Sequence, residues 1–504
     1  MYKVNYESRI VFKKYKVKVP VTIKSRRELS LSYNELGDIE KGLGNLEEAK
    51  RNYEKALEIR EKLERETKTV LSRRDLFESY IKLGDIEKGF GKLEGAKRNY
   101  EKALEISEKL ERETKTIKSR RDLTISYDRL GNTEQGLGNL EEAKRNYEKA
   151  LEIREKLERE TKTADSRYDL SVSYIKLGDI EQDLGKMEGA KRNYEKALEI
   201  SEKLERETNT VKSRRNLSIS YVKLGDTEQG LGSLEGAKRN YEKALEINEK
   251  LARETKTVES CHDLAISYGR LGEIEESLEN LEGAKRNYEK ALVISEKLAE
   301  KTNTIESRRV LAIRYGRFGD IEESLGNLEG AKRNYEKALV ISKKLAEKTN
   351  TIESRRVLAI SYGRFGDIEE SLGNLEGAKR NYEKALEISK KLAGETNTIE
   401  SRRVLAISYG RLGDIEKSMG NLEGAKKYYE KDLEIIEKLA GETKTVSAYD
   451  DLAESYYNVG ILDGNIDKEF LTKAFEIWDY LAQSCPSMPS FAQRRDIVKR
   501  LLQR

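Results

Sequence analysis

The 504-residue chain has very few of the residues that cross-link a fold or carry acid-base and metal chemistry. Two cysteines, Cys261 and Cys485, cannot build a disulfide scaffold, and His262 is the single histidine. No apolar run is long enough to span a membrane, and lysines interrupt every short apolar stretch near the N-terminus, as they would not in a signal peptide. We therefore predict no metal site, no cofactor, no enzymatic activity, no membrane partner and a cytoplasmic location.

Proline is nearly absent, since only Pro20, Pro486 and Pro489 occur. A helix interior rejects proline by about 3 kcal/mol, whereas loops and sheet proteins use it freely. The long proline-free stretch is rich in Glu, Lys, Leu and Ala, and charged residues make up 38% of the chain. This composition predicts an all-α protein. Because 97 Lys and Arg nearly balance 93 Asp and Glu, bulk charge does not indicate a nucleic-acid partner.

The sequence repeats every 47 residues. One tyrosine series runs from Tyr33 to Tyr456, a second starts at Tyr53, and a glycine series runs from Gly37 to Gly460, all with the same interval. Three series in one register indicate tandem duplication. Within a unit, apolar residues alternate by three and four before and after a Gly44-Asn45 turn, which predicts two helices of about 18–22 residues each. Ser72 is the expected N-cap of the following helix.

The same register organises the ends of the chain. Residues 1–24 resemble a degenerate second helix that would cap the N-terminus, because Asn5-Tyr6-Glu7 repeats Asn52-Tyr53-Glu54. An extended strand over residues 10–23 is the alternative. Residues 25–447 hold nine units, residues 448–489 an atypical tenth, and residues 490–504 a C-terminal capping helix. Atypical terminal units close the exposed apolar ends of a repeat stack.

The positions that recur from unit to unit are, in the first unit, Tyr33, Leu36-Gly37, Gly44, Ala49, Tyr53 and Ala56. This pattern resembles the tetratricopeptide repeat family, in the longer form found in kinesin light chains and in bacterial signalling and immune proteins. Two features depart from that motif: its inner-face tyrosine is Glu40 here, and its closing proline is missing. The resemblance implies an α-α superhelix, a solenoid of about ten helix-turn-helix units with terminal capping helices.

A row of glutamates, Glu40, Glu87, Glu134 and their successors, falls by phase on the packing side of the first helix of each unit. An unpaired carboxylate there would be costly. We therefore predict a salt bridge or a tyrosine hydroxyl partner in the adjacent helix. A row of acidic ligand contacts is the alternative.

The opposite side of each first helix carries the positions of Arg27, Leu31, Asn34, Asp38 and Lys41, and we call it the first-helix face. Stacking turns these positions into rows. The basic row contains Arg27, Arg74, Arg121, Arg215, Arg309, Arg356 and Arg403. The apolar row contains Leu31, Ile125, Val172, Ile219, Ile266, Ile313, Ile360 and Ile407. The acidic row contains Asp38, Asp85, Asp179, Asp226, Glu273, Asp320, Asp367 and Asp414, and the row of Asn34 shrinks to Gly269, Gly316, Gly363 and Gly410.

In the family that the chain resembles, this face lines the concave groove that holds a partner. An apolar floor between charged rows, with vacant glycine slots, predicts a groove for an extended peptide or protein segment. The alternative is a regulatory or oligomerisation arm of an effector enzyme, carried on another chain or on a lost N-terminal region. Nucleic acid is a disfavoured partner, because the acidic row would repel it. Self-association of the near-identical repeats stays open.

Overall fold

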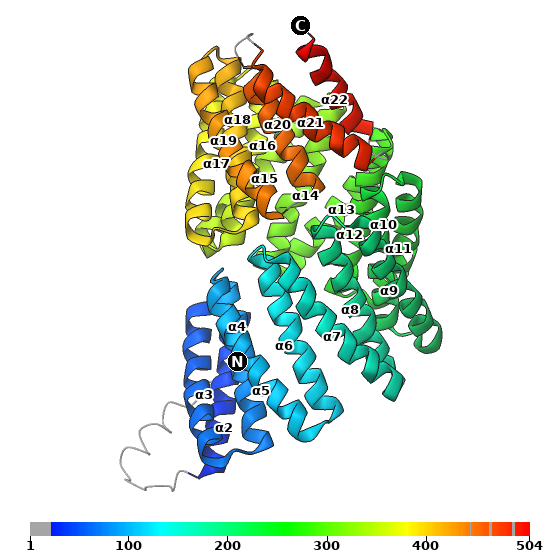
Figure 1. Ribbon diagram of the computed structural model, residues 1–504, viewed down its shortest axis with the longest axis vertical. Helices are drawn as coiled ribbons and strands as arrows, with labels where there is room; N and C mark the ends of the chain where they lie inside the picture. The colour runs from blue at the N-terminus through cyan, green and yellow to red at the C-terminus, as the bar shows by residue number, and fades with distance from the viewer. Residues whose placement is uncertain (1–21, 444, 463–465, 486–488, 504) are drawn as a thin grey trace. The chain divides into compact units, whose positions relative to one another are not determined.

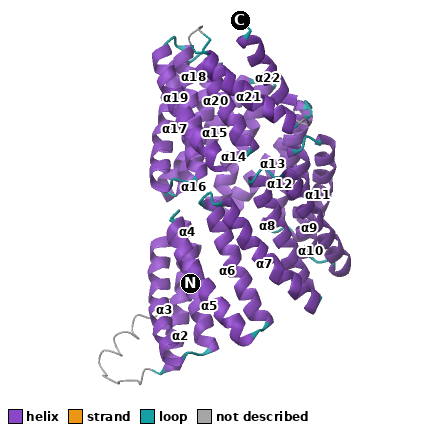
Figure 2. Ribbon diagram, in the orientation of Figure 1, coloured by secondary structure: helices purple, strands orange, loops and turns teal. Residues whose placement is uncertain are grey.

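The computed structural model describes residues 22–443, 445–462, 466–485 and 489–503. Those residues form twenty-one α-helices and no strand (Figures 1 and 2). The predicted all-α fold is confirmed. Most of the predicted N-terminal cap, with its strand alternative, lies outside the described residues.

The helices alternate between two lengths. The first helices of the units have 20 residues each and are α2 (Ile23–Gly42), α4 (Val70–Gly89), α6 (Ile117–Gly136), α8 (Ala164–Asp183), α10 (Val211–Gly230), α12 (Val258–Ser277), α14 (Ile305–Ser324), α16 (Ile352–Ser371) and α18 (Ile399–Ser418). The second helices have 22 residues each and are α3 (Leu46–Thr67), α5 (Leu93–Thr114), α7 (Leu140–Thr161), α9 (Met187–Thr208), α11 (Leu234–Thr255), α13 (Leu281–Thr302), α15 (Leu328–Thr349), α17 (Leu375–Thr396) and α19 (Leu422–Thr443). Three helices of other lengths follow: α20 (Val446–Gly460), α21 (Lys468–Ser484) and α22 (Pro489–Leu502).

The chain divides into two compact units, Met1–Ser126 and Tyr127–Arg504, with the boundary inside α6. Within each compact unit, the first helix of a repeat packs against the second helix of the same repeat. That second helix packs in turn against the first helix of the next repeat. This order of consecutive packed pairs is that of an α-α solenoid.

A tyrosine packed against a glycine joins the two helices of each repeat. The ring of Tyr335 on α15 lies across Gly319 on α14, so that a Cβ on Gly319 would lie 2.5 Å from the ring atom Cε1. The Tyr335 hydroxyl donates a hydrogen bond of 2.9 Å to Asp320, the residue after the glycine. The same glycine–tyrosine contact recurs from Gly37 to Gly413. The two helices can approach this closely only because the glycine has no side chain.

The helix ends correct one prediction. Thr69, and not Ser72, is the N-cap of α4, and Ser72 is the third residue of the helix. The Thr69 hydroxyl accepts from the Ser72 amide at 3.1 Å, while the Ser72 hydroxyl accepts from the Thr69 amide at 3.1 Å. This reciprocal capping box satisfies two amides that the helix leaves free. The preceding Lys68 ends α3 with a φ of 49°, so the chain reverses within two residues.

The packing-side glutamates form salt bridges between repeats, as predicted. Glu322 of α14 lies 2.8 Å from Lys285 of α13, and Glu369 of α16 lies 2.8 Å from Lys332 of α15. Burial alone would raise the pKa of Glu416, but hydrogen bonds from Lys379 and an asparagine hold that pKa below its ordinary value. The alternative interpretation of this row, as acidic ligand contacts, stays a prediction.

A second polar layer crosses the core at each junction between repeats, and its members vary. Ser342 and Ser361 are buried and 2.8 Å apart. At the equivalent place near the N-terminus, the fully buried Arg60 donates to the Asp75 carbonyl at 2.7 Å. Arg154 instead lies 2.6 Å from the Asp128 carboxylate. Some junctions therefore carry different hydrogen-bond pairs within one repeated geometry, whereas Ser342–Ser361 and Ser389–Ser408 form the same pair at successive junctions.

Asp432 of α19 places an acid where the preceding repeat has Ala385. It is buried, and its side-chain hydrogen-bond partner among the described residues is the Ser455 hydroxyl, which donates at 2.7 Å. Burial, reinforced by the nearby carboxylates of Asp451 and Glu454, raises the pKa of Asp432 to about 7.

Replacing Gly319 by alanine should destabilise the repeat, because the new methyl group overlaps the Tyr335 ring. Overpacking of this kind costs about 1–3 kcal/mol. The control is Gly394→Ala on α17, where no atom lies within 4 Å of the added carbon. Alanine there should stabilise the helix by up to about 1 kcal/mol. Urea unfolding followed by circular dichroism measures both, and equal free energies for the two variants would contradict the proposed role of the contact.

Replacing Asp432 by asparagine should raise the melting temperature at pH 8 and leave it nearly unchanged at pH 4. The native state holds the Asp432 proton up to a pKa of about 7. An unfolded aspartate releases its proton near pH 3.9, so this residue lowers stability as pH rises between the two values. Thermal denaturation at the two pH values tests the sign. A gain of equal size at both would show that burial does not control this proton.

Candidate functional site

The basic row of the first-helix face is held by ion pairs that cross between repeats. Arg309 lies 2.9 Å from Glu353, and Arg356 lies 2.8 Å from the same carboxylate and also bonds Glu400. The other members pair one repeat further along the chain, in contacts Arg27–Asp75 at 2.5 Å, Arg74–Asp122 at 3.2 Å, Arg215–Asp263 at 2.5 Å and Arg403–Asp451 at 2.9 Å. Arg121 also has an interaction partner. The row is thus a chain of bridges along the face.

The acidic row accepts hydrogen bonds from the tyrosines of its own repeats. The hydroxyl of Tyr382 donates to Asp367 at 2.9 Å, and that of Tyr429 donates to Asp414 at 2.6 Å. Equivalent tyrosines bond Asp38, Asp85, Asp179, Asp226 and Asp320. Cations of the following repeat add ion pairs, with Arg364 at 2.7 Å from Asp320 and Arg411 at 2.6 Å from Asp367. In the sequence, each of these aspartates precedes its tyrosine by 15 residues, and this constant spacing could have indicated the hydrogen bonds.

The prediction of vacant glycine slots is wrong for three of the four glycines. Guanidinium groups of Arg314, Arg364 and Arg411 occupy the space beside Gly269, Gly316 and Gly363, respectively. Of the four, only Gly410 has open space beside it, because a Cβ atom added there would meet no atom within 4 Å. The arginines belong to the following repeat in each case, and reasoning on one repeat at a time missed them.

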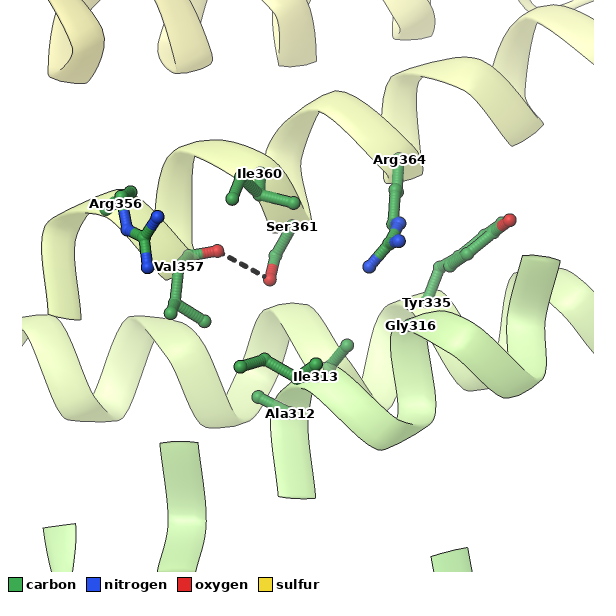
Figure 3. Close-up of a pocket in the computed structure, with 10 residues that line it drawn as sticks. Ala312, Ile313, Gly316, Tyr335, Arg356, Val357, Ile360, Ser361 and Arg364 are labelled. Atoms are coloured by element: carbon green, nitrogen blue, oxygen red, sulfur yellow. Dashed lines mark hydrogen bonds between the residues drawn. The ribbon is translucent and has the colours of Figure 1, made fainter. Parts of the chain in front are cut away.

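A small cavity lies between α14 and α16 on the first-helix face (Figure 3). It brings together four residues from the predicted rows, Ile313, Ile360, Arg356 and Gly316. The remaining lining residues are Ala312, Tyr335, Ala338, Val357, Ser361 and Arg364. The two isoleucines face each other across the cavity, and the two arginines lie at its opposite ends (Figure 3). Its volume of about 50 Å³ suits the branched end of one aliphatic side chain.

Outside this cavity the apolar row is more open to solvent. Ile266 is half-buried, whereas Ile407 is 47% exposed. Ile125 and Ile219 are each 39% exposed, and Leu31 and Val172 are half-buried. Within the unit Tyr127–Arg504, the row therefore continues from Val172 to Ile407 as a partly exposed aliphatic strip.

Arg314 is the one arginine in a row that is otherwise serine at the equivalent positions from Ser79 to Ser455. Its guanidinium packs on Gly269, its Nε has no hydrogen-bond partner, and burial lowers its pKa. The hydroxyl of Ser295 consequently has no serine opposite it and keeps the bond to a carbonyl of its own helix, Ala291 at 2.8 Å.

The described residues contain no group of three or more His, Cys, Asp or Glu side chains that could hold a metal ion. Across that same part of the chain, every helix is too short or too polar to cross a bilayer.

Replacing Arg314 by serine should stabilise the protein by about 1 kcal/mol, because a buried unsatisfied donor is removed and a serine pair can form with Ser295. The reverse change, Ser361→Arg, should destabilise, since Arg364 already fills the space beside Gly316. Urea unfolding of the two variants measures the difference. Loss of stability on Arg314→Ser would mean that the guanidinium is well accommodated.

Comparison with known proteins adds to this geometry. Tetratricopeptide repeat profiles match residues 28–109, 122–182 and 169–250, and a second such profile matches residues 265–297, 313–344, 359–392 and 406–438. No curated protein sequence matches the chain.

Several solved structures resemble the chain at low sequence identity and low TM-score. BtubC (BKLC) from P. vanneervenii is 18% identical, with a TM-score of 0.37 over 53% of this chain and 92% of that one. A signal transduction ATPase with numerous domains and a tetratricopeptide repeat sensor, from Pyrococcus horikoshii, is 18% identical, with a TM-score of 0.41 over 85% of this chain and 57% of that one. Yeast Tom70 is 14% identical, with a TM-score of 0.36 over 94% of this chain and 95% of that one. On its repeats, the chain belongs to the tetratricopeptide repeat family.

Proposed function

We propose that the chain is a protein-interaction scaffold that binds an extended peptide or protein segment along the first-helix face. Repeat stacks of this type present extended binding surfaces formed by successive units. The cavity between α14 and α16 carries the proposal, because it is an apolar seat on the face where the sequence predicts a groove.

The chemistry of the cavity favours one aliphatic side chain of the partner. Its walls are isoleucine, valine, alanine and tyrosine, and removing an aliphatic group from water contributes about 25 cal/mol per Å² of buried apolar area. The arginines at its two ends are already paired, Arg356 with Glu353 at 2.8 Å and Arg364 with Asp320 at 2.7 Å. The two arginines therefore border the cavity, and the charge of each is balanced by its carboxylate partner. The partly exposed aliphatic strip extends the contact to neighbouring repeats.

Selection of a displayed library of 12-residue peptides on the full chain tests this function. We expect enriched peptides that share an aliphatic residue. Their affinity should fall at least tenfold on the double variant Ile313→Asn/Ile360→Asn, which makes the cavity polar while each side chain keeps its number of heavy atoms. A tenfold loss corresponds to about 1.4 kcal/mol.

The matched control is Val293→Asn/Val340→Asn. These exposed aliphatic residues lie on the second helices α13 and α15, and they receive the same chemical change. Peptide binding should survive it. A library that enriches no peptide, or peptides that bind both double variants equally, would contradict binding at the first-helix face.

A further inference from the structure

One position on the first-helix face changes its charge along the chain. It lies three residues after the acidic row and is occupied by Lys41, Lys88, Gln135, Gln182, Gln229, Glu276, Glu323, Glu370 and Lys417. From Gln135 to Glu370 the side chain lies next to the tyrosine hydroxyl of its own repeat. The hydroxyl of Tyr241 is 3.1 Å from Gln229, and that of Tyr335 is 2.9 Å from Glu323. Neutral and charged side chains therefore occupy the same local geometry in different repeats.

Within the described part of the chain, the three glutamates accept hydrogen bonds from hydroxyl groups alone. Glu323 accepts from Tyr335 at 2.9 Å and from Ser371 at 3.0 Å. Glu370 accepts from Tyr382 at 3.0 Å and from Ser418 at 3.2 Å. Glu276 accepts from Tyr288 at 2.9 Å.

These glutamates therefore have no direct ion-pair partner among the described residues. No Lys or Arg of the described residues lies within 4.0 Å of any of the three, although the adjacent Asp320 and Asp367 each have an arginine partner. Tyr335 lies between Asp320 and Glu323, at 2.9 Å from each, but its hydroxyl has one proton to donate. We call Glu276, Glu323 and Glu370 the carboxylate row.

The carboxylate row and the cavity are neighbours. The side chain of Tyr335 lines the cavity (Figure 3). Its hydroxyl donates a hydrogen bond to Glu323. A segment seated in the cavity would therefore pass close to the row. All three glutamates are half-buried, so that a cation placed on them would interact in a medium less screened than bulk water.

The spacing of the row matches an extended chain. The three glutamates lie on successive first helices, α12, α14 and α16, and the last two of these helices contact each other. Packed helices lie about 8–10 Å apart, and an extended chain advances about 3.3 Å per residue. Neighbouring carboxylates are thus about three residues of an extended partner apart.

We propose that the carboxylate row selects an extended basic segment, with Lys or Arg at about every third residue. The proposal rests on the proposed function and specifies the chemistry of its partner. Three charge pairs on one segment act together, because the first contact raises the effective concentration of the others. An acidic segment or a nucleic acid would meet three carboxylates that have no direct ion-pair partner among the described residues.

The test uses fluorescein-labelled 12-residue peptides and the full chain. One peptide has lysine at every third position, and two others replace these lysines by glutamine or by glutamate, with all other residues kept. Fluorescence anisotropy at 50 and 200 mM NaCl gives the dissociation constants. We expect the lysine peptide to bind at least tenfold more tightly than the glutamine peptide at low salt, with a smaller difference at high salt.

The triple variant Glu276→Gln/Glu323→Gln/Glu370→Gln should abolish this preference. Glutamine is tolerated in the same geometry at Gln182 and Gln229, so the variant keeps the fold. The control Glu289→Gln/Glu336→Gln/Glu383→Gln makes an equal charge change on exposed residues of α13, α15 and α17, and it should keep the preference.

Each remaining outcome overturns the inference. Equal binding of the lysine and glutamine peptides removes the charge selection and leaves the proposed function intact. Equal loss in the triple variant and its control shows an effect of net charge instead of the row. No binding by any of the three peptides also overturns this inference, whereas the proposed function is decided separately by the peptide selection.

Discussion

The packing of a tyrosine ring against a glycine sets the geometry of every repeat from Gly37 to Gly413. The ring takes the place that a side chain would need, and its hydroxyl ties the second helix to an aspartate on the first in most repeats. Because that aspartate also pairs with a cation of the next repeat, one contact inside a unit orients the bridge to the following unit. The row of aspartates, which sequence reasoning assigned to a partner, is part of this arrangement.

The polar layer between repeats addresses a problem that near-identical units create. A core of Ala, Leu and Tyr at the same positions in each unit would pack almost as well if neighbours were exchanged. The buried pairs differ, with two serines at one junction and the Arg154–Asp128 ion pair at another. Buried ion pairs contribute little net stability, but a mismatched one would leave a charge unpaired. The Arg154–Asp128 junction therefore disfavours a wrong neighbour, whereas the identical serine pairs Ser342–Ser361 and Ser389–Ser408 do not discriminate between their junctions.

The fold followed from sequence periodicity because each helix depends on residues within one unit. The glutamates that follow Glu40 were also placed correctly, since their phase alone puts them against the adjacent helix. The occupied glycine slots could not be found in the same way. The arginine beside Gly316 comes from a residue 48 positions later, and its reach depends on how one unit stacks on the next. The helix cap was missed by three residues because Thr69 and Ser72 are both suitable capping residues.

The bridges on the first-helix face join partners 44 or 48 residues apart, so each ties a repeat only to its immediate neighbour. Loss or gain of one whole 47-residue unit within residues 307–447, where the repeats are almost identical in amino-acid sequence, would therefore rebuild the same bridges across the new junction. The length of the protein can therefore change by one repeat at a time without a change in how neighbouring repeats pack. Loss or gain of one such unit would shorten or lengthen the binding face, together with the number of carboxylates that it displays.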